Sequence, residues 1–63
     1  MTVVEYIVKY YWKDGFTNSV RFDNYGSALH EADSEYTFNK DVVDYYEITK
    51  VTNSYELMKS NKE

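Results

Sequence analysis

The sequence predicts an α+β fold whose elements follow one another in the order β-β-α-β. Three observations indicate it. Residues 3–12 are rich in β-branched and aromatic side chains and contain no Gly or Pro, a Lys-Asp-Gly turn signal follows them, and apolar side chains recur every three or four positions across 25–36. We expect a three-stranded antiparallel sheet in the order 2-1-3, with the single helix packed on one face.

Residues 3–12 form the predicted central strand. Successive side chains of a strand point to opposite faces, so the even positions from Val4 to Trp12 make one uncharged face that is rich in aromatic rings. The odd positions alternate apolar and charged side chains. We expect the even face to lie against the helix and the odd face to stay uncovered.

The turn that follows decides which faces of the first two strands coincide. A two-residue loop would put Phe16 on the mixed face, whereas a three-residue loop at 13–15 pairs Trp12 with Phe16 and keeps the aromatic side chains on one side. This pattern favours the three-residue loop, with Gly15 in the left-handed position of a bulge. The second strand then spans 16–22 and is polar enough for the edge of a sheet.

Asn24 is the predicted N-cap of the helix, because its side chain can accept hydrogen bonds from the free amides of the first turn. Gly26 weakens that turn by up to about 1 kcal/mol relative to Ala. We expect the helix to end near 36–38, with Asn39 as a left-handed C-cap. The apolar face of the helix comprises Tyr25, Ala28, Leu29, Ala32 and Tyr36.

Residues 42–51 form the predicted third strand, and their alternation allows two orientations. Either Val42, Tyr46 and Ile48 point inward, or Val43, Tyr45 and Val51 do. We favour the first set. The predicted domain covers residues 1–53. Residues 54–63 form a C-terminal tail that either docks as a short helical turn through Tyr55, Leu57 and Met58 or frays.

Composition limits the chemistry of this chain. It has 63 residues, a formal net charge of −4 and no cysteine, so disulfides, thiolate metal sites and thiol nucleophiles are absent. The single histidine, His30, lies in the middle of the predicted helix, with Glu31 beside it and Ser27 and Ser34 one turn away. A catalytic imidazole needs its partners in a pocket, and one helix on three strands offers little concavity, so we expect His30 at the surface. We expect no catalytic, metal or cofactor site. No signal peptide or apolar stretch of ~20 residues is visible, so we expect a cytoplasmic protein without membrane contact.

The middle of the chain is strongly acidic. Residues 23–47 contain seven carboxylates and one lysine. Such an excess keeps a tyrosine-rich protein in solution and repels nucleic-acid phosphates. If the carboxylates instead contact a partner protein, the candidates are Glu31, Asp33, Glu35, Asp41 and Asp44.

The face of the sheet away from the helix is the second candidate surface. One helix covers one side only, and an exposed apolar patch of several hundred Å² usually marks a partner surface. We expect this face to bind a partner or to form a homodimer. Its apolar members are predicted to be Val3, Ile7, Tyr11, Val43 and Tyr45, with Val51 at the end.

The order of these motifs resembles that of small proteins encoded by bacteriophages and mobile elements. The motifs are the aromatic strand, the Lys13-Asp14-Gly15 turn, a strand ending Val20-Arg21-Phe22-Asp23, a helix opening at 24–29 and a closing strand at 46–51. The chain is similar, in particular, to the short dimeric inhibitors of uracil-DNA glycosylase from phages of Bacillus, whose closing segment is of the type seen here at 41–51.

That resemblance implies a protein that acts in the cytoplasm of a bacterial host, with Glu31, Asp33 and Glu35 imitating DNA phosphates. We therefore expect a small acidic inhibitor of a host defence or DNA-processing protein, such as a restriction or CRISPR component. The alternative is a homo-oligomeric assembly module without a host target. A second alternative is a single-stranded nucleic-acid binder that stacks bases on Tyr11 and Tyr45.

Overall fold

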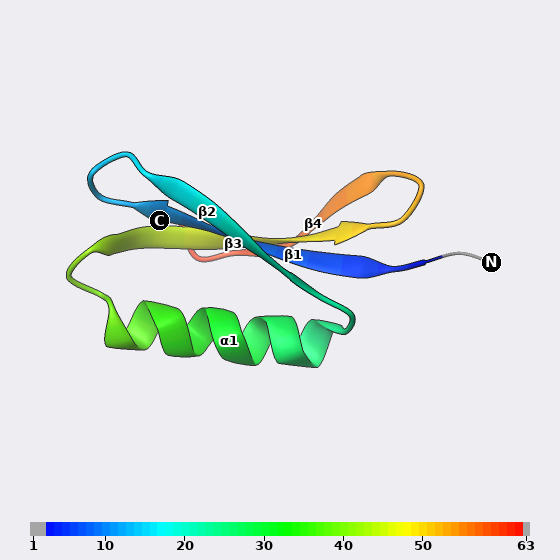
Figure 1. The fold of residues 1–63 in the computed structure, drawn as a ribbon, viewed down its shortest axis with the longest axis horizontal. Coiled ribbons are helices and arrows are strands. Elements are labelled where there is room, and N and C mark those ends of the chain that lie inside the picture. The colour runs from blue at the N-terminus through cyan, green and yellow to red at the C-terminus, as the bar shows by residue number, and fades with distance from the viewer. Residues whose placement is uncertain (1–2, 63) are drawn as a thin grey trace.

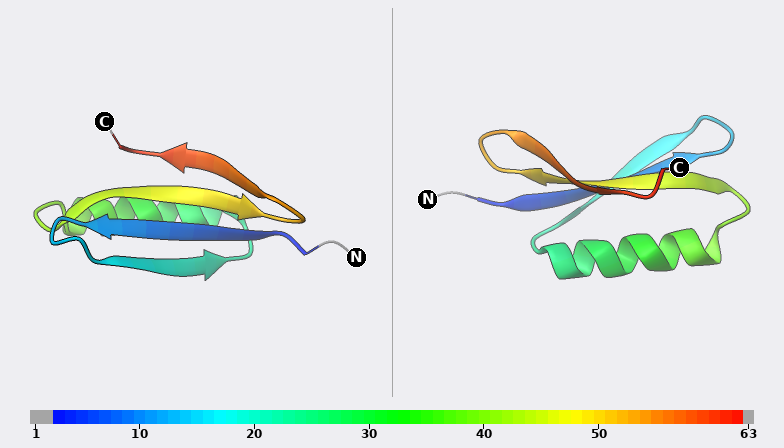
Figure 2. Two further views of the ribbon diagram at one scale, coloured as in Figure 1. Left: turned by 90° about the horizontal axis from the view of Figure 1, so that it is seen from above. Right: turned by 180° about the vertical axis from the view of Figure 1, so that it is seen from behind.

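A computed structural model describes residues 3–62, which form one helix on one face of a four-stranded antiparallel sheet (Figure 1). The α+β class is confirmed, and so is the 2-1-3 order of the first three strands. A fourth strand extends the sheet to the order β2-β1-β3-β4 (Figure 2). The elements are β1 (Glu5–Trp12), β2 (Thr17–Phe22), α1 (Tyr25–Phe38), β3 (Val43–Val51) and β4 (Tyr55–Ser60).

The hairpin of β1 and β2 has the predicted three-residue loop. Val8 lies opposite Val20, and the amide of Trp12 donates to the carbonyl oxygen of Phe16 at 2.8 Å. Gly15 has a φ of 93°, in the left-handed region that side chains disfavour. The register therefore follows the hydrophobic pattern, and the even face of β1 points toward α1.

Helix α1 begins as predicted and ends differently. The side chain of Asn24 accepts a hydrogen bond from the amide of Ser27 at 2.8 Å. Asn39 has a φ of −120°, so the predicted left-handed C-cap is wrong. Its side-chain amide instead donates to Glu35 Oε1 at 2.9 Å, and its backbone N–H donates to the carbonyl oxygen of Glu35. These bonds close the last turn without a change of backbone hand.

The core lies between α1 and the central strands. Ala28 and Ala32 are the buried residues of the helix, and their small size lets it approach the sheet closely. Figure 1 shows α1 running along one side of the sheet, while the β1–β2 and β3–β4 hairpins curve away on the other side. The buried core cluster comprises Val8, Tyr10, Ala28, Ala32, Tyr46 and Ile48.

A β-bulge in β3 settles the two orientations that the sequence left open. Tyr11 lies opposite Tyr45 but Trp12 lies opposite Val43, so Asp44 is an extra residue that reverses the alternation. Val43 and Tyr46 are therefore both buried on the helix side, at 1 % exposure each.

The predicted inward positions of Tyr46 and Ile48 are confirmed. The predicted inward position of Val42 is wrong, because its side chain is exposed. Placing Val43 on the uncovered face is also wrong, since the bulge turns this residue toward the core.

The prediction for residues 54–63 as a tail that docks as a helical turn or frays is wrong. Residues 55–60 form β4, which pairs antiparallel with β3 and places Val51 opposite Tyr55. Asn61 secures the end of β4, because its Oδ1 atom accepts from the amide of Tyr46 at 2.7 Å. The hydrogen-bonding groups along the outer side of β3 are the physical reason for this strand, and they are not visible in the tail itself.

Candidate protein-binding surface

The sheet face opposite α1, here called the open face, has no helix or strand over it within residues 3–62 (Figures 1 and 2). The strand registers place residues of all four strands on it. They are Thr17, Ser19 and Arg21 of β2, Glu5, Ile7, Lys9 and Tyr11 of β1, Tyr45, Glu47, Thr49 and Val51 of β3, and Tyr55, Leu57 and Ser60 of β4.

One end of the open face carries four apolar side chains beside the ion pair of Glu5 and Arg21. Val51 lies opposite Tyr55 on the neighbouring strand, and in the adjacent row Thr49 lies between Ile7 and Leu57. Tyr55 is 80 % exposed and Leu57 is 58 % exposed, whereas Ile7 and Val51 are half-buried. We call these four residues the apolar strip. They give one end of the face a surface that water solvates poorly.

The other end of the open face is a stack of two tyrosines. The rings of Tyr11 and Tyr45 are 4.2 Å apart and nearly parallel, at 11°. The ammonium nitrogens of Lys9 and Lys62 each lie 5.1 Å from the centroid of one ring, and the hydroxyl of Tyr11 donates to Glu47. This hydrogen bond is the main reason that the pKa of Tyr11 is raised to about 12.

The stack bears on the nucleic-acid alternative. A protein that stacks bases presents the free face of an aromatic ring to them. Tyr11 and Tyr45 each have one face against the other and a lysine ammonium over the ring, so contacts within the chain already use both rings. The two residues lie on the open face as predicted, but they stack on each other and on lysines of the same chain.

The three helix carboxylates have different surroundings. Asp33 accepts a hydrogen bond from the hydroxyl of Tyr46 at 2.6 Å, and Glu35 accepts one from Asn39. Burial, and next this bond to Asp33, raise the pKa of Tyr46. Asp33 and Glu35 therefore support the fold, while the side chain of Glu31 is exposed on α1.

The last two predicted carboxylates lie elsewhere. Asp41 is exposed in the connection between α1 and β3, and Asp44 is the exposed bulge residue of β3. The five carboxylates thus come from the helix, a loop and a strand.

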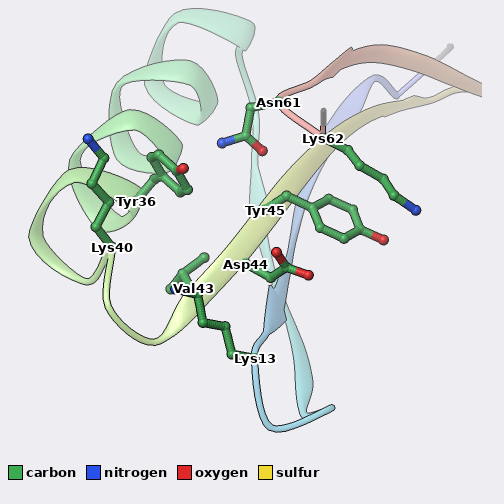
Figure 3. Close-up of a pocket in the computed structure, with 8 residues that line it drawn as sticks. All are labelled: Lys13, Tyr36, Lys40, Val43, Asp44, Tyr45, Asn61 and Lys62. Carbon is green, nitrogen blue, oxygen red and sulfur yellow. The ribbon is translucent and has the colours of Figure 1, made fainter.

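Asp44 borders the hollow drawn in Figure 3, which has a volume of about 430 Å³. Three lysines, Lys13, Lys40 and Lys62, line it together with uncharged residues. Figure 3 shows the side chains of Lys40 and Lys62 extending away from each other rather than toward a shared point. The hollow therefore balances the charge of Asp44 without gathering the three ammonium groups around a bound anion.

No family model, curated protein or solved structure matches this chain. Within residues 3–62, no helix is long and apolar enough to cross a membrane. The same residues contain no group of three or more His, Asp or Glu side chains placed to hold a metal ion.

Sequence reasoning missed Tyr55 and Leu57, the most exposed members of the apolar strip. A signal for them exists, because Tyr55, Glu56 and Leu57 alternate apolar and charged side chains directly after the turn-forming Asn53 and Ser54. Three residues are a short pattern, and it becomes decisive only when β3 offers an edge for pairing.

Proposed function

We propose that this protein acts by binding another protein through the open face of its sheet, as a small inhibitor of a host defence or DNA-processing protein. The observation that supports the proposal is the apolar strip. Tyr55 and Leu57 project from a sheet face that no other element shields in the described chain. Contiguous apolar surface on a small protein is a common mark of a partner interface.

The chemistry of the strip suits an anchor at the centre of such an interface. Tyr55 offers a large ring, a hydroxyl and few rotatable bonds, which is why tyrosine is enriched among the residues that dominate binding energy. Ile7 and Val51 are already held by neighbouring strands, so little side-chain freedom is lost when a partner covers them. We infer that the partner presents an apolar depression or ridge to the strip.

Charge has a separate role in the proposal. The chain carries a net charge of −4, and a partner that binds DNA carries a basic groove. Complementary charges speed the encounter and lose effect as salt rises, whereas buried apolar contacts resist salt. We therefore infer that Glu31, Asp41 and the other exposed carboxylates attract the partner over distance, while the apolar strip holds it.

Capture of the partner from bacterial lysate tests the proposal with two matched variants. Ile7→Lys places a charge in the apolar strip. Phe38→Lys makes the same chemical change at the end of α1, where the side chain is 85 % exposed and lies off the open face. The protein that the wild type retains should be lost with Ile7→Lys and kept with Phe38→Lys.

Circular dichroism must first show that both variants are folded. If Ile7→Lys is folded and retains the partner as well as the wild type does, the open face is not the interface and the proposal is wrong. Loss of the partner with Phe38→Lys alone would place the interface on the helix side instead.

A further inference from the structure

Strand β4 is an exposed edge of the sheet. It pairs with β3 on one side only, so main-chain N–H and C=O groups along its other side have no strand partner within residues 3–62. Helix α1 packs against β1, β2 and β3 but not against β4. Three of the six residues of β4 have exposed apolar side chains, namely Tyr55, Leu57 and Met58.

We infer that β4 pairs antiparallel with β4 of a second copy of this chain, around a two-fold axis perpendicular to the sheet. The full overlap of the two strands places Tyr55 opposite Ser60 of the second copy and Glu56 opposite Lys59 of the second copy. By symmetry each pair occurs twice. Opposite charges directly across two strands stabilise pairing, and like charges destabilise it.

The bulge in β4 makes this register possible. In a regular strand, Glu56 and Lys59 would point to opposite faces. Here Glu56 lies opposite Lys50 and Lys59 lies opposite Ile48, so both belong to the face that α1 covers in the rest of the sheet. Met58 is the extra residue of the bulge, and it shifts the alternation so that Glu56 and Lys59 point to the same face. The opposite charges can therefore meet on that face when two copies of β4 pair.

The residues at the two ends of β4, Tyr55 and Ser60, also point to a common face. Tyr55 lies opposite Val51, and Ser60 lies opposite Glu47, which places both on the open face. Neither Glu56 nor Lys59 forms an ion pair inside the described chain, where the single ion pair joins Arg21 to Glu5 at 3.5 Å. Both charges of β4 are therefore available to a second copy.

The other edge of the sheet lacks this complementarity. Strand β2 carries one charged residue, Arg21, which already pairs with Glu5. Pairing β2 of one copy with β4 of the next would be head-to-tail and would lead to a ring or an open filament larger than a dimer. Pairing between two β4 strands closes after two copies and satisfies both charges.

The dimer goes beyond the proposed function and does not depend on it. Two four-stranded sheets would join into one continuous sheet, with both helices on one side and both open faces on the other. A joint formed by two short strands buries less area than a standard protein interface, so we expect association in the micromolar range rather than a permanent dimer.

Sedimentation equilibrium tests this pairing. The mass should rise with concentration from 7.5 kDa to about twice that value and then stop. Lys59→Glu should weaken association at least about fivefold, because it creates two like-charge pairs across the joint and its partner on β3 is the uncharged Ile48. Glu56→Lys should weaken association at least as much, but it also places a lysine opposite Lys50 of the same chain, so Lys59→Glu is the decisive single change. The double variant Glu56→Lys/Lys59→Glu should associate more tightly than either single variant, since the charges across the joint are opposite again; Glu56→Lys is its matched reference, because both place a lysine opposite Lys50.

Matched controls change the same charges away from β4. Glu31→Lys and Lys13→Glu alter the net charge as the single variants do and should leave association unchanged. A measurement on the wild type needs no variant. Hydrogen exchange of amides in β4 should slow as the protein concentration rises, while exchange in β2 should not change.

Four results would overturn the pairing. They are a monomer at all concentrations up to about 1 mM, a mass that keeps growing past the dimer, a dimer that ignores both single changes, and a dimer that Ile7→Lys abolishes. The second result would indicate pairing of β2 with β4, and the last would place the dimer interface on the open face.

Discussion

At the scale of single residues, Tyr10 and Tyr46 are the two largest side chains of the buried core. Tyr10 and Tyr46 are buried, yet each hydroxyl reaches a polar partner at the boundary with α1: the carbonyl oxygen of Glu31 for Tyr10 and the carboxylate of Asp33 for Tyr46. A tyrosine ring buries a large area, and its hydroxyl must be satisfied when it is buried. The acidic helix supplies the acceptors.

The first prediction concerns alkaline pH. Burial raises the pKa of Tyr10 from 10.0 to about 12, with Glu35 and Glu31 adding to the effect. Between these values the unfolded chain releases the proton and the folded chain keeps it. Each such group therefore lowers the free energy of unfolding by about 1.4 kcal/mol per pH unit as pH rises. The stability is fully present below pH 10 and is lost toward pH 12.

Urea unfolding at about pH 9 and about pH 11.5 measures this loss. Tyr10→Phe should lose less stability between the two pH values than the wild type does. Tyr55→Phe, a change at an exposed ring, should lose as much as the wild type. Equal losses in wild type and Tyr10→Phe would show that the burial of Tyr10 does not govern its ionisation.

At the scale of elements, local signals specify the start of α1 and the hairpin. Asn24 caps the first turn, and Gly15 provides the positive φ of the loop. The two glycines of the chain therefore have different roles. The positive φ at position 15 requires glycine, whereas Gly26 lies in a helix that most other residue types would stabilise.

Gly26→Ala should stabilise the protein by about 0.5–1 kcal/mol, because Ala restricts the unfolded chain and favours the helix. The added Cβ atom would meet only the side-chain oxygen of Asn24, at 3.5 Å, which is an ordinary contact. Urea unfolding measures the change. Gly15→Ala should instead lower stability, since its φ is 93°. A loss of stability in Gly26→Ala would mean that the capped turn has no room for a side chain.

At the scale of the whole molecule, β4 is the strand that the rest of the fold holds least. Helix α1 covers the other three strands, whereas β4 is held by its pairing with β3, by the short turn before it and by Asn61 after it. Strands with few packed neighbours open more readily than the core. The surfaces proposed for binding thus include the part of the sheet that is held least.

Asn61→Ala tests how β4 is held. The change removes the side-chain oxygen of residue 61, which accepts a hydrogen bond from the backbone amide of Tyr46. Hydrogen exchange at Tyr46 and along β4 should accelerate, while exchange in β1 should change little. Asn53→Ala, in the turn before β4, is the matched control. Uniform acceleration in all strands would show that β4 opens only when the whole fold does.

The sequence alone determined the features whose causes lie within a few residues of one another. The register of β1 and β2, the cap at Asn24 and the extent of α1 follow from turn residues and from the spacing of apolar side chains. For the same reason, Ile7 and Tyr11 lie on the open face as predicted. Tyr45 also lies there, in agreement with the favoured orientation, but its place depends on the pairing of β3 with β1.

Only the tertiary structure decided the orientation of β3, the existence of β4 and the composition of the apolar strip. The bulge at Asp44 exists only where β3 meets β1, and it takes Val43 into the core. Residues 55–60 become a strand because β3 has a free side to pair with, which brings Tyr55 and Leu57 onto the open face. The pairing of β1 with β3 joins distant residues such as Tyr11 and Tyr45, so no short window of sequence contains the cause of the bulge. The pairing of β3 with β4 is a hairpin around residues 52–54, but no glycine marks that turn as Gly15 marks the first one.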